Sequence, residues 1–157
     1  MPMIYSLIRE QLIPAPLAAV WDYFSSPGNL LEITPSYMRF RVTSRHYEGP
    51  IYPGQIITYK VSPVAGIPLL WVTEITQVKP LAYFVDEQRS GPYRMWHHEH
   101  HFEAAGDGTR MKDIVHYRLP LGWLGTLAHG LFVKRQLESL FDYRTAQITR
   151  RFGPVSL

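Results

Sequence analysis

The stretch that decides the fold is LFVKRQLESLFDYRTAQITRRF, residues 131–152. It contains no Gly and no Pro, and its apolar residues recur at spacings typical of one buried face on an α-helix. Arg150 and Arg151 occupy the last turn, where the helix dipole favours cations, and Gly153-Pro154 follow as a stop signal. The apolar positions are Val133, Leu137, Leu140, Phe141, Ile148 and Phe152.

The helix extends back to about Gly122, which gives a rod of roughly 45 Å. Gly125 and Gly130 weaken this beginning, so we expect residues 123–130 to form a separate, mobile turn. A helix of that length in a small protein must pack across a broad surface. Its apolar stripe also brings Arg144 or Thr145 toward that surface. Arg144 then either extends its charge to solvent or supplies a polar group inside a cavity.

The residues before this helix predict that the surface on which it packs is a β-sheet. Residues 4–13, 38–45, 55–61, 67–79, 81–89, 94–104 and 109–119 read as strands, and residues 16–24 and 27–33 read as two short helices. Short turns between consecutive strands favour antiparallel pairing. We therefore predict an α+β fold: a seven-stranded antiparallel sheet curled around a long C-terminal helix, with two short helices between strands 1 and 2.

Length and composition exclude several classes of site and function. The 157 residues suit one domain, expected over residues 1–157, and the absence of Cys excludes disulfides and thiol nucleophiles. A net charge of +3 is too mild to indicate nucleic-acid binding, and no stretch is long enough for a membrane helix. Met1–Tyr5 show no signal-peptide pattern, so we expect a cytoplasmic protein. The oligomeric state stays open.

The most unusual stretch is WHHEHHFE, residues 96–103. Strand alternation places Trp96, His98, His100 and Phe102 on one face, and His97, Glu99, His101 and Glu103 on the other. The wholly polar set should face water. A four-residue loop at 105–108 sets the pairing with the next strand, because a one-residue slip would bring Lys112, His116 and Arg118 inward. The resulting inward pairs are Phe102 with Met111, His100 with Asp113, His98 with Val115, and Trp96 with Tyr117.

Three interpretations of the inward histidines compete. They are ordinary interior residues satisfied by Asp113, Tyr117 or water; or they orient the polar end of a bound ligand; or they hold a metal with Asp113 as third ligand. A His100–Asp113 pair also suits proton transfer, although no Ser or Thr nucleophile motif accompanies it. We predict no metal and no cofactor.

The chain resembles the START-like superfamily, also called SRPBCC, over essentially its whole length. That superfamily includes birch-pollen-allergen-like proteins, polyketide cyclases and coenzyme Q-binding proteins, and the nearest likeness is to bacterial cyclase/dehydrase-like members. The segments that carry the resemblance are Ile13–Pro16 with Val20–Phe24, Ser26–Leu30, Phe84–Gln88 with Gly91–Tyr93, Trp96–Phe102, and Gly108–Met111 with Asp113. It implies a deep, mostly apolar pocket between the sheet and the long helix.

The leading functional hypothesis is binding or transport of a hydrophobic small molecule such as a lipid, an isoprenoid quinone or a polyketide-like aromatic. Trp96, Phe102, Met111, Val115 and Tyr117 would form the wall, His98, His100, Asp113 and Arg144 would fix a polar end, and residues 62–68 and 123–130 would gate access. The alternative is a cyclase or dehydratase that uses His100 and Asp113 for proton transfer. An interaction module with a collapsed cavity is a third possibility.

Overall fold

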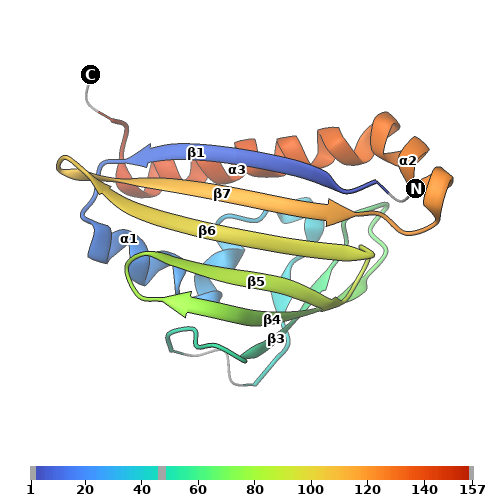
Figure 1. Ribbon diagram of the computed structural model, residues 1–157, viewed down its shortest axis with the longest axis horizontal. Coiled ribbons are helices and arrows are strands. Elements are labelled where there is room, and N and C mark those ends of the chain that lie inside the picture. Colours follow the sequence, from blue (N-terminus) through green and yellow to red (C-terminus); the bar gives the residue numbers. More distant parts are fainter. Residues whose placement is uncertain (1–2, 46–48, 156–157) are drawn as a thin grey trace.

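A computed structural model describes residues 3–45 and 49–155, so the predicted domain range of 1–157 extends past the described residues at both ends. The chain forms one antiparallel sheet with a long C-terminal helix against it (Figure 1). The strands are β1 (Tyr5–Ile13), β2 (Arg41–Val42), β3 (Ile56–Val61), β4 (Leu69–Lys79), β5 (Tyr83–Ser90), β6 (Met95–Ala105) and β7 (Gly108–Arg118). The helices are α1 (Leu17–Phe24), α2 (Gly122–Ala128) and α3 (Lys134–Phe152), with 3-10 turns η1 (Pro27–Leu31) and η2 (Ser36–Met38) and a π-turn η3 (His129–Val133).

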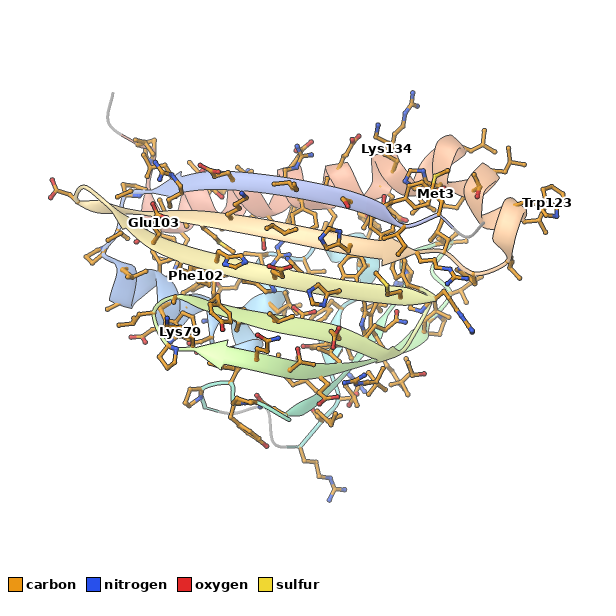
Figure 2. The ribbon with its side chains drawn as sticks, viewed as in Figure 1. Met3, Lys79, Phe102, Glu103, Trp123 and Lys134 are labelled. Carbon is orange, nitrogen blue, oxygen red and sulfur yellow. The ribbon has the colours of Figure 1, made fainter. Side chains whose placement is uncertain are left out.

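The sheet runs in the order β1-β7-β6-β5-β4-β3-β2, which confirms the predicted seven-stranded helix-grip arrangement. Every neighbouring pair is antiparallel. The β6–β7 turn at Glu103 and helix α2 at Trp123 mark opposite ends of the molecule (Figure 2). Helix α3 lies behind β1 and β7 and spans most of the distance between these ends (Figure 1).

The long helix buries the face that its sequence predicts. Val133, Leu137, Phe141 and Ile148 are all buried against the sheet, and the helix ends at Gly153, whose φ of 93° suits a residue without a Cβ. The expectation of a separate turn at 123–130 is wrong in one respect. These residues are helical and lead into α3 through η3, which contains Gly130.

The hairpin of β6 and β7 has the predicted register. Phe102 lies opposite Met111, His100 opposite Asp113, His98 opposite Val115, and Trp96 opposite Tyr117. The turn is tighter than predicted, because Ala105 still pairs with Gly108 and only two residues connect the strands. Gly106 adopts a φ of 60°, which glycine tolerates without strain.

One local prediction between β1 and β3 is wrong. The strand expected over residues 38–45 shrinks to β2, because Met38 belongs to η2 and Arg39 has a left-handed φ of 47° that turns the chain before pairing can begin. Ser26 does not cap the turn that follows it. Its hydroxyl donates a 2.8 Å hydrogen bond back to the Asp22 carbonyl oxygen instead.

Candidate functional site

The cavity nearest the predicted site lies between the sheet and α3. It has a volume of about 160 Å³ and is lined by side chains from α1, η1, strands β3 to β6, and α3. Most of its wall is apolar, including Ile57, Val61, Ile75 and Phe84. We call it the inner cavity.

A second cavity adjoins it toward α2. This outer cavity has a volume of about 300 Å³, and residues 37–38, 63–71, 92–96 and 119–140 contribute its almost wholly apolar wall. Four side chains line both cavities and so form the partition between them: Met38, Trp71, Trp96 and Leu140. The sheet and helix therefore leave two neighbouring hollows along α3.

Five polar side chains meet at one side of the inner cavity: Asp86, His98, His100, Asp113 and Arg144, here called the polar cluster. All but Asp86 are buried, and Asp86 retains 17% side-chain exposure. His98 and His100 come from β6, Asp86 from β5, Asp113 from β7, and Arg144 from α3. Four of the five line the inner cavity, whereas Asp113 lies behind the histidines.

Each histidine has its own carboxylate. His98 Nε2 donates a 2.7 Å hydrogen bond to Asp113 Oδ1, and His100 Nε2 donates a 2.7 Å hydrogen bond to Asp86 Oδ2. His100 Nδ1 lies 3.1 Å from the same Asp113 oxygen, close enough for an ion pair but without hydrogen-bond alignment. The two rings are 3.7 Å apart, centroid to centroid. The predicted His100–Asp113 pairing is therefore part of a larger network, and the hydrogen-bond partner of His100 is Asp86.

The network fixes which groups carry charge. Burial alone would raise the pKa of Asp113, but its close contact with His100 and its hydrogen bond with His98 hold that pKa well below its usual range. Asp86 behaves in the same way, with His98, His100 and Arg144 outweighing its burial and lowering its pKa.

The pKa values of the two histidines shift in opposite directions. Burial opposes protonation of His100, but Asp113 and Asp86 outweigh it and raise the pKa of that imidazole. Burial and the neighbouring His100 charge lower the pKa of His98, and the two carboxylates do not compensate. These directions favour protonation of His100 over that of His98, an arrangement in which His100 and Arg144 balance Asp86 and Asp113.

Arg144 is buried, which settles the alternative in which it extends to solvent. It retains 9% exposure, and its guanidinium lies 5.1 Å from the centroid of the Phe141 ring on the preceding turn. Its charge also helps to lower the pKa of Asp86. The α3 helix therefore supplies a cation to a site otherwise built by the sheet.

Asp86, His98 and His100 could also hold a metal ion. One ligand atom from each lies within 4.8 Å of the others, and Asp113 sits behind the histidines where it would orient their rings. Asp113, the third ligand considered from the sequence, is absent from this set of three. Asp86 already accepts a hydrogen bond from His100 and lies in the field of the positive charge of Arg144. The polar cluster therefore needs no metal ion to compensate this carboxylate.

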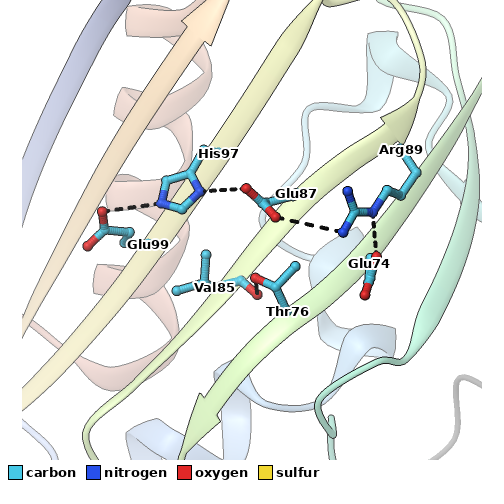
Figure 3. A network of polar contacts seen from close by, with 7 residues as sticks. All are labelled: Glu74, Thr76, Val85, Glu87, Arg89, His97 and Glu99. Carbon is cyan, nitrogen blue, oxygen red and sulfur yellow. Dashed lines mark hydrogen bonds and ion pairs between the residues drawn. The ribbon is translucent and has the colours of Figure 1, made fainter.

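The outward face of β6 forms a separate, surface network (Figure 3). His97 lies 2.9 Å from Glu87 and 3.3 Å from Glu99, while Arg89 pairs with Glu74. The β5–β6 turn decides which of Glu87 and Gln88 faces inward. Glu87 faces this outer network, whereas the Gln88 side chain bonds to the Tyr93 backbone at the β5–β6 turn.

Apart from Asp113, which lies behind the histidines, the predicted site residues divide into two groups. Trp96, His98, His100 and Arg144 line the inner cavity. The remaining predicted wall residues are buried but line neither the inner nor the outer cavity, because they pack in the core beside them: Phe102, Met111, Val115 and Tyr117. Tyr117 instead bonds His129 through its hydroxyl at 2.8 Å.

Asp86 is the member of the polar cluster that sequence reasoning missed. It lies directly opposite His98 in the β5–β6 pairing, and Phe84 lies opposite His100. The alternation Phe84, Asp86, Gln88 contains the signal, but reading it requires the register across the 90–93 turn. The apolar wall from β3 and β4, including Ile57 and Trp71, was missed too, because no pattern tied those strands to the histidine strand.

Comparison with known proteins identifies the family. The sequence pattern of "Polyketide cyclase / dehydrase and lipid transport" matches residues 13–141, which is most of the 157-residue chain. The chain belongs to this family. Membership confirms the predicted START-like (SRPBCC) resemblance, and a search of curated proteins finds no match.

Several solved structures have the same fold as this family member. Protein CV1439 from Chromobacterium violaceum superposes with a TM-score of 0.71 at 12% identity, covering 96% of this chain and 98% of that one. Protein Ms6760 from Mycobacterium smegmatis gives 0.64 at 18% identity, with 93% and 92% covered. Major latex-like protein 151 from Panax ginseng gives 0.64 at 10% identity, with 96% and 99% covered. At these identities the likeness establishes the helix-grip fold and nothing finer.

Proposed function

We propose that this family member binds a hydrophobic small molecule whose body occupies the apolar cavities and whose polar end meets the polar cluster. The observation that carries the proposal is an apolar hollow under α3 with a buried, charge-balanced set of hydrogen-bonding groups on one side. The family description, which includes lipid transport, supports the same ligand class.

The polar cluster favours a neutral polar group over a charged one. His100 and Arg144 already compensate Asp86 and Asp113, so an added charge would find no free counter-charge. A hydroxyl or carbonyl group, as in an alcohol, a quinone or a polyketide-like aromatic, can exchange hydrogen bonds with these side chains without that penalty. Apolar burial would supply most of the affinity.

The size of the hollows constrains the ligand. Ligand sites are typically roughly 300–1,000 Å³, and the inner cavity alone is smaller, at about 160 Å³. A drug-sized ligand therefore requires the partition side chains Trp71 and Leu140 to move aside and join the two cavities. A small aromatic could occupy the inner cavity by itself.

The test is ligand recovery from purified, tag-free protein, by native mass spectrometry and solvent extraction. We expect one hydrophobic molecule per chain in the parent. Ile57→Trp fills the inner cavity and should abolish recovery, whereas Ile56→Trp should retain it, because Ile56 is the next residue on β3 and faces solvent at 49% exposure. Equal recovery from both variants, or none from the parent after supplementation with lipid extract, would contradict the proposal.

An enzyme of the cyclase or dehydratase type is the second candidate, favoured by the Asp86–His100 pair that faces the inner cavity. The raised pKa of His100 favours its protonated form, which is the form that can donate a proton, and Asp86 holds its ring. Incubation of the recovered ligand with fresh protein would reveal turnover as loss of water or ring closure. A His100→Gln variant should then keep binding and lose turnover; loss of both together would argue against a catalytic role.

A further inference from the structure

One end of the molecule carries a concentration of exposed apolar side chains that the interior does not require. We define the apolar tip as ten residues on two segments: Val64, Ile67, Leu69 and Leu70 before and at the start of β4, and Leu121, Trp123, Leu124, Leu127, Leu131 and Phe132 around α2 and η3. Trp123 is 75% exposed and Leu121 is 74% exposed. Figure 2 shows Trp123 projecting away from the sheet at this end.

The two segments form one surface. Val64 and Leu69 from the first and Leu121, Leu124 and Phe132 from the second line the same outer cavity. The Gln136 side-chain amide also donates a hydrogen bond to the Pro63 carbonyl oxygen and ties α3 to the first segment. The apolar tip therefore borders the outer cavity, and its exposed side chains mark the solvent-facing side of that cavity.

The chain segments that form the apolar tip carry basic residues and no acidic ones. Residues 62–71, 88–96 and 118–135 contain no Asp or Glu. Arg94 and Arg118 line a pocket beside residues 119–122, and Lys134 and Arg135 directly follow the second segment. Within residues 3–45 and 49–155, none of these four cations has a carboxylate at ion-pair distance.

We propose that the apolar tip docks on the surface of an anionic lipid bilayer. Exposed Leu, Phe and Trp side chains partition into the boundary between headgroups and acyl chains, and each flanking Lys or Arg adds roughly 1 kcal/mol near an anionic surface. In the described part of the chain no helix has the length and apolar character to cross a membrane, which fits shallow docking by the short α2–η3 segment.

Charge argues against a second copy as the occupant. An isologous dimer through the apolar tip would bring the same four cations of both copies together, which destabilises the contact. A bilayer containing anionic lipid offers complementary charge as well as an apolar layer. The proposal stands on this surface alone and does not require the cavities to be filled.

The first experiment measures binding of the tag-free chain to phosphatidylcholine vesicles with and without phosphatidylglycerol, by sedimentation and tryptophan fluorescence. We expect binding to anionic vesicles that is roughly tenfold or more tighter than to neutral ones and that weakens with added salt. Trp123 should report it as a blue shift, because Trp21 and Trp96 are buried and Trp71 is half-buried. A Trp123→Phe variant should bind without the shift.

Substitutions distinguish the apolar contribution to vesicle binding from the electrostatic contribution. Trp123→Ser with Leu127→Ser should weaken binding to anionic vesicles by roughly tenfold or more. Lys134→Gln with Arg135→Gln should weaken it by roughly fivefold per charge, and only on anionic vesicles. Ile8→Ser and Leu31→Ser are matched controls, since both side chains are more than half exposed but lie outside the apolar tip. Circular dichroism confirms that each variant folds.

Three outcomes would overturn the proposal. The parent chain binds neither kind of vesicle; the Trp123/Leu127 double variant binds as tightly as the parent; or the parent self-associates in size-exclusion chromatography and the same double variant makes it monomeric, which would assign the surface to a second copy. Ligand recovery is unaffected by any of these results, so the two proposals fail independently.

Discussion

At the scale of single residues, the polar cluster is a closed set of charges inside an apolar wall. Its members come from three adjacent strands and from α3, so it forms only when sheet and helix have docked. A buried carboxylate or imidazole without its partner is strongly destabilising, because the remaining charge has no water to solvate it. Each member is thus held in place by the others.

This interdependence predicts how stability responds to acid. The folded-state pKa of Asp113 lies below its unfolded value of about 3.9. Its contribution to stability is therefore present above about pH 4 and is lost as the pH falls toward the folded pKa. Urea unfolding between about pH 6 and about pH 2.5 should show a steep fall in the free energy of unfolding.

Asp113→Asn should flatten that fall and lower stability near neutral pH by roughly 3–5 kcal/mol, because His98 and His100 lose their shared carboxylate. The matched control is Asp107→Asn, at the tip of the β6–β7 turn, which should leave the pH profile unchanged. An Asp113→Asn profile parallel to that of the parent would show that this carboxyl is not perturbed by folding.

At the scale of elements, two predictions succeeded because a strong periodic pattern determined them. The β6–β7 register followed from keeping Lys112, His116 and Arg118 out of the interior, and the α3 face followed from its apolar spacing. The failures have local causes that such patterns do not carry. Arg39 turns the chain through a left-handed conformation, and register shifts next to Thr73 and Gln77 break the alternation of β4 against β5.

The same contrast explains why Asp86 was missed while His98 and His100 were found. The histidines sit on a strand whose pairing on one side is fixed by a two-residue turn. Asp86 sits on β5, whose inward face is decided by the β5–β6 turn and by a neighbour with irregular register. Site residues on such strands can be identified only from the tertiary structure.

Helix α3 should stabilise the fold through its buried face. Ile148 is 4% exposed and belongs to the core cluster beneath the sheet. Ile148→Ala should cost roughly 2–5 kcal/mol in the free energy of unfolding, whereas Leu131→Ala, 67% exposed at the start of the same helical stretch, should change it by less than roughly 0.5 kcal/mol. Similar losses in both variants would mean that α3 is not docked as described.

At the scale of the whole molecule, the capacity for ligand depends on the partition between the two cavities. Trp71 lines both of them and packs edge-on against Trp96, with ring centroids 5.3 Å apart. Its removal would leave Met38, Trp96 and Leu140 as the remaining shared wall. Ligand size is therefore set by a few side chains and not by the sheet itself.

Trp71→Ala should join the cavities and shift the recovered ligands toward longer or bulkier molecules, measured by mass spectrometry of solvent extracts. Tyr83→Ala is the matched control, because Tyr83 is a half-buried aromatic that packs against His101 on the outer face of the sheet. Unchanged ligand masses in Trp71→Ala would indicate that ligands use only one of the two hollows.

The π-turn η3 has a consequence for how such a protein can change. A π-turn holds one residue more than an α-helical turn, so deleting a single residue from His129–Val133 would restore regular winding and leave α2 close to its present direction. The same deletion within α3 would rotate everything before it by about 100° about the helix axis. A one-codon deletion is therefore tolerated at the π-turn, independent of side-chain identity, and not within the regular helix that follows it.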